Sequence, residues 1–241
     1  MDRRHSSGHQ ELIRAEMLPS YRILVFGPRG SGKETLCERL RVGHYVPRPI
    51  NVEYSPADLL PVTQWKSVVD GQECQIKAMI HRTGDLREYY IRSSMLVTGI
   101  HGVVVTYDAT SSESFASVET HVAEVRDMNA EKKVQSPQEV LDYPIVLAAT
   151  RCDLVSETGA EQAAGRELVA RLKLLGFYET SAKSGEGIEE PFSGIIRESR
   201  RREGGISKSD IKTGEINPNT GPQKKAGWPT RLKKRLEKLL H

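Results

Sequence analysis

The sequence predicts an α/β fold: a mostly parallel six-stranded sheet with one antiparallel edge strand, flanked by helices. Short apolar runs at residues 102–107 and 144–149 are typical of buried parallel strands, and they alternate with segments of helical periodicity. Asp70-Gly71 lies between two strand-like runs, residues 62–69 and 73–80, and this dipeptide favours a tight hairpin. The hairpin accounts for the antiparallel pair, and the alternation accounts for the parallel strands.

The remaining elements follow from local periodicity and from the residues that begin or end helices. In chain order we expect a strand at 21–26, a helix from about 35, a helix from about 111 to about 128, a helix at about 159–175, a strand at 177–180 and a helix from 186 to about 201. Residues 129–143 are polar and contain Pro137, which predicts a loop insertion.

Length and composition predict one folded domain with two tails. The chain has 241 residues and a net charge of +3, and no run of about 18 apolar residues is long enough to span a bilayer. We expect a disordered extension at 1–18, a domain at 19–201, and a linker with a basic amphipathic tail at 202–241. The polar N-terminus does not resemble a signal peptide, and the three separated cysteines are typical of free thiols in a reducing compartment, so we expect a cytoplasmic protein.

The segment from Gly27 to Lys33 matches the phosphate-binding pattern G-x-x-x-x-G-K. An apolar strand precedes it, and leucines at helical spacing follow it, which is the setting that a P-loop requires. In such a loop, backbone N–H groups cradle phosphates and the lysine reaches their oxygens. The pattern therefore indicates a P-loop nucleotide-binding fold, the alternative being an ordinary turn between a strand and a helix.

Glu34 occupies the position after Lys33 where the pattern requires a Ser or Thr hydroxyl for Mg²⁺. A carboxylate there faces bound phosphate, and two unit charges about 4 Å apart interact by roughly 4 kcal/mol at an effective dielectric of about 20. We therefore expect weakened nucleotide binding, unless a cation or another rotamer removes the carboxylate from the phosphates.

Over about residues 20–201 the chain resembles Ras-type small GTPases. The resemblance rests on the P-loop and on five further stretches, which are residues 54–57, 69–74, 81–84, 150–153 and 179–183. The last of these, Glu-Thr-Ser-Ala-Lys between a strand and a helix, is the most specific. The resemblance implies a small G protein that binds GTP or GDP in signal transduction, with effector or regulator proteins at residues 44–63 and 81–92 and no nucleic-acid partner.

The resemblance assigns guanine recognition to the loop after residue 149. Asp153 would accept two N–H bonds from the base, and Arg151 would lie over the purine. Thr150 replaces the family's asparagine, which is expected to remove an amide that braces the loop, and Tyr45 would meet the base edge-on. The second guanine loop would be formed by Ser181, Ala182 and Lys183.

The same resemblance predicts a dismantled metal and catalytic site. Ala57 and His81 replace a threonine and an aspartate that support Mg²⁺, which leaves Glu34 or Thr35 as the remaining candidate ligand. Gly84 is retained for the γ-phosphate, but Asp85 replaces the glutamine that orients water. Asp85 and Gly84 thus occupy the family's catalytic positions without an assigned role, and Arg29 would crowd the γ-phosphate.

The predicted nucleotide-binding residues come from the P-loop, the two base loops and the segment after residue 80. They are Gly27, Arg29, Gly30, Ser31, Gly32, Lys33, Glu34, Thr35, Tyr45, Gly84, Thr150, Arg151, Asp153, Ser181, Ala182 and Lys183. We expect guanine-nucleotide binding with impaired Mg²⁺ binding and hydrolysis. Two alternatives stay open, a slow GTPase with a rearranged metal site and an interaction module that needs no nucleotide.

The C-terminal tail has the pattern of a basic amphipathic helix. Residues 222–241 hold seven Lys or Arg and one Glu, and Leu232, Leu236, Leu239 and Leu240 form one apolar stripe. No cysteine follows Cys152, so we expect no prenylation. The tail is therefore expected to bind an anionic membrane surface through residues 228–241, or else to be a solvated basic tail or a nuclear-import patch.

The full chain is predicted to co-sediment with anionic vesicles, less at high salt, and not with neutral vesicles. Each Lys or Arg near an anionic leaflet contributes roughly 1 kcal/mol, and salt screens that attraction. Deleting residues 222–241 should abolish co-sedimentation and leave the thermal transition of the domain in place. Vesicle binding that survives the deletion would assign the interaction to another part of the chain.

Overall fold

The computed structural model describes residues 18–47, 62–81, 99–135, 143–155 and 160–205. The expected N-terminal extension, residues 54–57, Gly84, Asp85 and the C-terminal tail lie outside these ranges. The described residues belong to one compact unit, Met1–Gly205. Within them, no helix is both long and apolar enough to cross a membrane.

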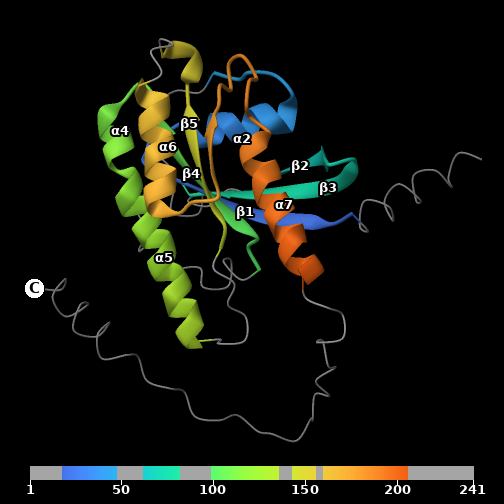
Figure 1. Cartoon of the computed structure of the whole chain (residues 1–241). Helices are drawn as coiled ribbons and strands as arrows, with labels where there is room; N and C mark the ends of the chain where they lie inside the picture. Colours follow the sequence, from blue (N-terminus) through green and yellow to red (C-terminus); the bar gives the residue numbers. More distant parts are fainter. Residues whose placement is uncertain (1–17, 48–61, 82–98, 136–142, 156–159, 206–241) are drawn as a thin grey trace, which may run out of the picture. The chain divides into compact units, whose positions relative to one another are not determined.

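The six strands form one sheet in the order β2-β3-β1-β4-β5-β6 (Figure 1). Only β2 and β3 are antiparallel, and every other neighbouring pair is parallel, which confirms the predicted fold class. The strands are β1 (Ser20–Phe26), β2 (Val62–Val69), β3 (Gln72–Ile80), β4 (Gly102–Asp108), β5 (Ile145–Thr150) and β6 (Gly176–Glu179). The tight turn between β2 and β3 contains Asp70 and Gly71, both at positive φ, as the hairpin pattern predicts.

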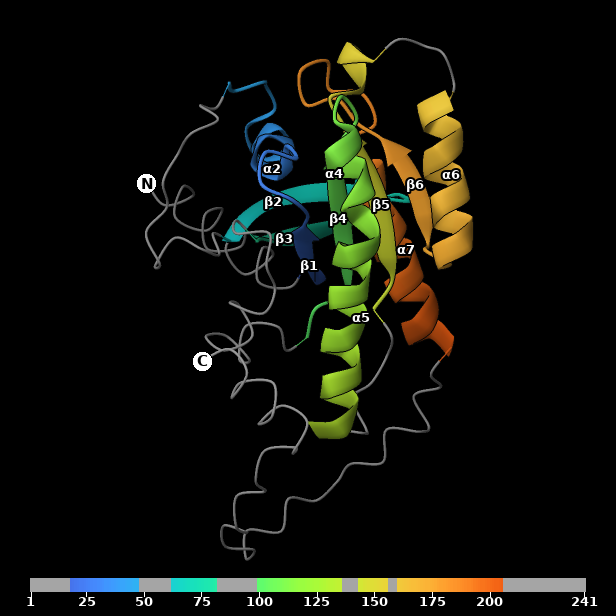
Figure 2. The same ribbon diagram turned by 90° about the vertical axis from the view of Figure 1, so that its left-hand side faces the viewer.

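Helices cover both faces of the sheet (Figure 2). Successive residues of the central strands project apolar side chains to opposite faces, so each face needs a covering layer. On one face, α2 (Lys33–Val42) and α7 (Glu190–Gly205) pack against a core that includes Ile23 and Val25 of β1. On the other face, α5 (Val118–Gln135) and α6 (Ala160–Leu172) pack against Leu24 and Phe26. A short helix, α4 (Ser112–Ala116), precedes α5, and a 3₁₀ turn, η2 (Cys152–Leu154), follows β5.

Several helix bounds differ from the sequence prediction. The segment expected as one helix from about 111 to 128 is divided at Ser117, and its second part continues to Gln135. The loop predicted from residue 129 is therefore wrong as far as residue 135, because the Ala, Glu, Lys and Gln residues there are good helix formers. The last helix begins at Glu190 rather than 186, after a turn in which Gly185 and Gly187 have positive φ, and ends at Gly205 rather than near 201.

Candidate functional site

The glycine-rich loop follows β1 and ends at the first residue of α2, as the sequence predicts. Its first glycine is required by a close approach to the neighbouring strand, because a Cβ on Gly27 would lie 2.2 Å from the carbonyl oxygen of Thr106. Gly32 adopts φ 77° at the N-cap of α2, where a Cβ would crowd the Thr150 side chain. The loop backbone is thus pressed against the ends of β4 and β5.

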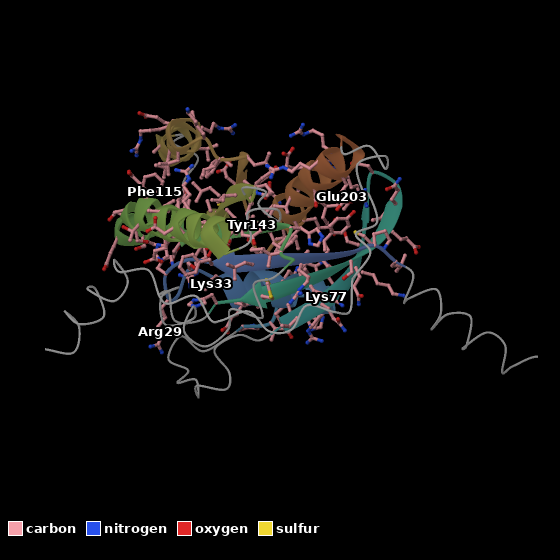
Figure 3. All side chains as sticks on the ribbon, turned by 90° about the horizontal axis from the view of Figure 1, so that it is seen from below. Arg29, Lys33, Lys77, Phe115, Tyr143 and Glu203 are labelled. Carbon is pink, nitrogen blue, oxygen red and sulfur yellow. The ribbon has the colours of Figure 1, made fainter. Side chains whose placement is uncertain are left out.

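Lys33 turns back over the loop and binds its carbonyl oxygens. Its Nζ donates to the oxygens of Gly27 and Pro28, each at 2.7 Å, and the residue is only 5% exposed. In Figure 3, Lys33 lies within the fold whereas Arg29 extends outward from the loop. Burial lowers the pKa of Lys33 to about 8, against the opposing effect of the neighbouring Glu34 carboxylate.

Thr150 at the end of β5 and the following residue, Arg151, bind two further carbonyls of the loop. The Thr150 hydroxyl lies 3.0 Å from the Ser31 oxygen and 3.1 Å from the Tyr107 oxygen, and it shares one hydrogen between them. Arg151 Nη2 donates to the Gly30 oxygen at 3.1 Å. Thr150 lacks the amide of the asparagine that it replaces, but its hydroxyl reaches the P-loop at the Ser31 carbonyl.

The consequence is a phosphate loop whose peptide planes are held by side chains. In a trans peptide the C=O and the following N–H point in opposite directions. The carbonyls of Pro28 and Ser31 are bound by Lys33 and Thr150, so the N–H groups of Arg29 and Gly32 point away from those two side chains. Helix α2 adds the N–H groups of its first turn. This donor set suits a nucleotide's phosphate chain.

The predicted base loop is also assembled. Asp153 lies in η2, and its Oδ1 accepts a hydrogen bond of 2.7 Å from the Ser181 hydroxyl. Ser181 Oγ in turn accepts the Ser184 N–H at 3.1 Å, so the carboxylate and the 181–184 turn are fixed together. Asp153 and Lys183 are exposed, and Ala182 is partly exposed, which leaves this edge accessible to a base. Tyr45 follows α2 and is 40% exposed.

Arg151, which the resemblance places over a purine, has partners for its guanidinium within the protein. Its guanidinium forms an ion pair with Asp108, the last residue of β4, while Nη2 holds the Gly30 carbonyl. Asp108 did not stand out in the sequence analysis. The feature that could have identified it is a single carboxylate in a strand whose other side chains are apolar or carry a hydroxyl. This carboxylate lies at the carboxyl end of the strand, where ligands bind in parallel sheets.

The metal side of the site contains few ligand candidates among the described residues. Glu34 and Thr35 are partly exposed in the first turn of α2. His81 is 2% exposed, with its ring edge-to-face on Phe26 at 5.3 Å, so it is buried in the core rather than solvated at the strand end. In the described ranges no three His, Cys, Asp or Glu side chains are grouped to hold a metal. At the start of α2, the oxygen ligands that Mg²⁺ prefers are represented by the Glu34 carboxylate and the Thr35 hydroxyl.

The fold and the loop together define a P-loop nucleotide-binding protein. A comparison with protein-family models matches the Ras family over residues 22–201. The chain belongs to the Ras family, and this membership implies guanine-nucleotide binding and interactions with effector or regulator proteins.

The buried lysine predicts a specific pH dependence of stability. Because burial lowers the Lys33 pKa from 10.5 to about 8, the unfolded chain binds more protons than the folded chain between these pH values. The Lys33 contribution to the free energy of unfolding should therefore increase as pH rises through that window. In urea titrations, wild type should gain stability relative to Lys33→Met between about pH 8 and about pH 10.5.

A Lys66→Met variant supplies the control, because Lys66 is exposed on the edge strand β2. Its stability difference from wild type should stay constant over the same pH range. A Lys33→Met difference that is equally constant would mean that the Lys33 ammonium is not desolvated in the loop.

Proposed function

We propose that this chain is a Ras-like small G protein that binds GTP and GDP for signalling, with impaired hydrolysis and little dependence on Mg²⁺. The observation that carries the proposal is the presence of two preset loops at the same edge of the sheet, one after β1 and the other after β5 and β6. Lys33 holds the phosphate loop by its carbonyls, and Ser181 holds the Asp153 carboxylate beside the second base loop. One nucleotide can meet both loops at once, with its phosphates at the first and its base at the second.

The weak metal dependence is proposed from the residues around the phosphate loop. Glu34 places a carboxylate where a hydroxyl ligand would serve Mg²⁺, and the His81 ring is packed on Phe26 inside the core. Phosphoryl transfer depends on metal charge and on a positioned water. Asp85, outside the described residues, supplies a carboxylate that cannot donate as an amide does. The proposed protein therefore binds the nucleotide but hydrolyses it slowly.

The proposed partners follow the resemblance and the charge of the tail. Effector or regulator proteins would contact residues 44–63 and 81–92, of which only 44–47, 62–63 and 81 are described. The basic tail at 228–241 would add contact with an anionic membrane surface. We propose that the nucleotide-bound protein contacts its partners through these surfaces.

The deciding experiment is to measure the nucleotide content of the purified protein and its calorimetric affinity for GTP, GDP and ATP with and without Mg²⁺. Bound guanine nucleotide and slow turnover support the proposal. Mg²⁺-dependent turnover of about 10⁻² per second, above the slow intrinsic rate of Ras-type GTPases, would favour a GTPase with a rearranged metal site. A stable protein that binds none of the three nucleotides would favour the interaction module.

Guanine nucleotides are predicted to bind at least about tenfold more tightly than ATP, roughly 1.4 kcal/mol. The reason is the Asp153 carboxylate, which accepts N–H groups that guanine presents and adenine lacks. Asp153→Ala should remove most of this preference in calorimetric titrations. Equal affinities for GTP and ATP in the wild-type protein would contradict the assigned base loop.

Chelation of Mg²⁺ is predicted to change GDP affinity by only a few-fold, and Glu34→Ser to tighten binding. The substitution removes a carboxylate from the phosphate side and restores a hydroxyl that can serve a metal. Calorimetry in EDTA and in Mg²⁺, on both proteins, measures the two effects. Complete loss of GDP from the wild-type protein in EDTA would show that a metal supports the site.

A further inference from the structure

Asp108 lies at the centre of a polar cluster between the base loop and the phosphate loop. It is 8% exposed, and its Oδ1 accepts the Thr110 N–H at 2.9 Å and the Thr110 hydroxyl at 2.7 Å. Its other oxygen, Oδ2, accepts from Arg151 Nη1. Both carboxylate oxygens are therefore used, and the carboxylate has a fixed orientation toward Arg151.

Arg151 connects Asp108 to the phosphate loop. The same guanidinium that binds Asp108 donates to the Gly30 oxygen through Nη2 at 3.1 Å. Its backbone is left-handed, with φ 60°, an uncommon conformation for a residue other than glycine. A fork of rigid donors can bind a carboxylate and a carbonyl together, which a single ammonium cannot do with the same geometry.

The Gly30 carbonyl and the Ser31 N–H belong to the same peptide group. That N–H donates to the Pro28 oxygen at 3.2 Å, and the Pro28 oxygen also accepts from Lys33 Nζ. Pinning the Gly30 carbonyl therefore orients a peptide that belongs to the same turn as the phosphate-loop lysine. The path from Asp108 to Lys33 is continuous through hydrogen bonds and the Gly30–Ser31 peptide.

We propose that Asp108 is a positioning residue for the phosphate chain of the nucleotide, acting through Arg151 on the Gly30–Ser31 peptide. The proposal rests on the proposed function, because the ligand is the guanine nucleotide that the two loops would bind. Asp108 orients the Arg151 guanidinium, and the guanidinium in turn orients the Gly30–Ser31 peptide. These contacts link the base loop to the phosphate loop.

A purely local role for Asp108 predicts different behaviour. Asp108 also closes the turn before α4, where its backbone oxygen accepts the Ser111 N–H at 3.0 Å and its side chain accepts from Thr110. If that turn were its whole role, Thr110→Val would reproduce the effect of changing Asp108. The effect would also be the same whether or not Arg151 is present.

The test is a double-mutant cycle on the full chain, with GDP as the titrant in calorimetry. Asp108→Asn keeps the size of the side chain and an acceptor for Thr110 but removes the charge that orients Arg151. It should weaken GDP binding by about fivefold, the difference between a charge-assisted and a neutral hydrogen bond. In an Arg151→Met background the same change should alter affinity by less than about twofold. Thr110→Val, which keeps the Thr110 N–H bond to Asp108, should weaken GDP binding by less than about twofold.

A second measurement needs no nucleotide. In ¹⁵N–¹H spectra of the stripped protein, Asp108→Asn and Arg151→Met should shift the Ser31 and Gly32 amide signals in the same direction, and Thr110→Val should shift them less. Unmoved amide signals would overturn the proposal, as would an equal loss of affinity in both backgrounds or tighter GDP binding by Asp108→Asn. If the wild-type protein binds no GDP but the amides shift, the proposed function fails while the positioning contact stands.

Discussion

The capture of phosphate-loop carbonyls by side chains is the interaction on which the rest of this site depends. Lys33 binds the carbonyls of Gly27 and Pro28 from the start of α2, while Thr150 and Arg151 bind those of Ser31 and Gly30 from the end of β5. A glycine-rich loop has many accessible conformations, and its ordering costs entropy. Hydrogen bonds from buried or charged donors offset that cost and leave the N–H groups oriented before any ligand arrives.

The register of the parallel strands places these donors. Phe26 is paired with Val105, and Asp108 is paired with Thr150, so β1, β4 and β5 deliver their last residues to the same edge of the sheet. Because successive strand ends meet there, a carboxylate on β4 can reach a guanidinium that follows β5. The close approach of Gly27 to Thr106 has the same origin. The loop geometry is thus a consequence of sheet register and not of the glycines alone.

The charge of Lys33 connects the phosphate loop to its proposed ligand. Burial disfavours the charged form of the Lys33 ammonium and lowers its pKa. An added phosphate anion would stabilise that charged form. Glu34 supplies part of the same stabilisation from within the chain, which reduces the advantage of the phosphate. The His81 ring packs against Phe26 in the core.

Sequence alone determined the fold class, the P-loop and the base loop, because each is written in contiguous residues whose pattern has a local physical cause. Glycines in the positive-φ region, alternating apolar strands and the Glu-Thr-Ser-Ala-Lys stretch need no partner to be recognised. The length of α5 was misjudged because helix-forming residues past residue 128 were taken as a polar loop.

Tertiary structure decided which side chains complete the site. The Thr150 contact with Ser31 joins residues 119 positions apart, and the Asp108–Arg151 pair spans 43 positions. It also placed the His81 ring in the core against Phe26. Such pairings depend on strand order and register, which a local pattern does not encode because any of several strand ends could have supplied the partner.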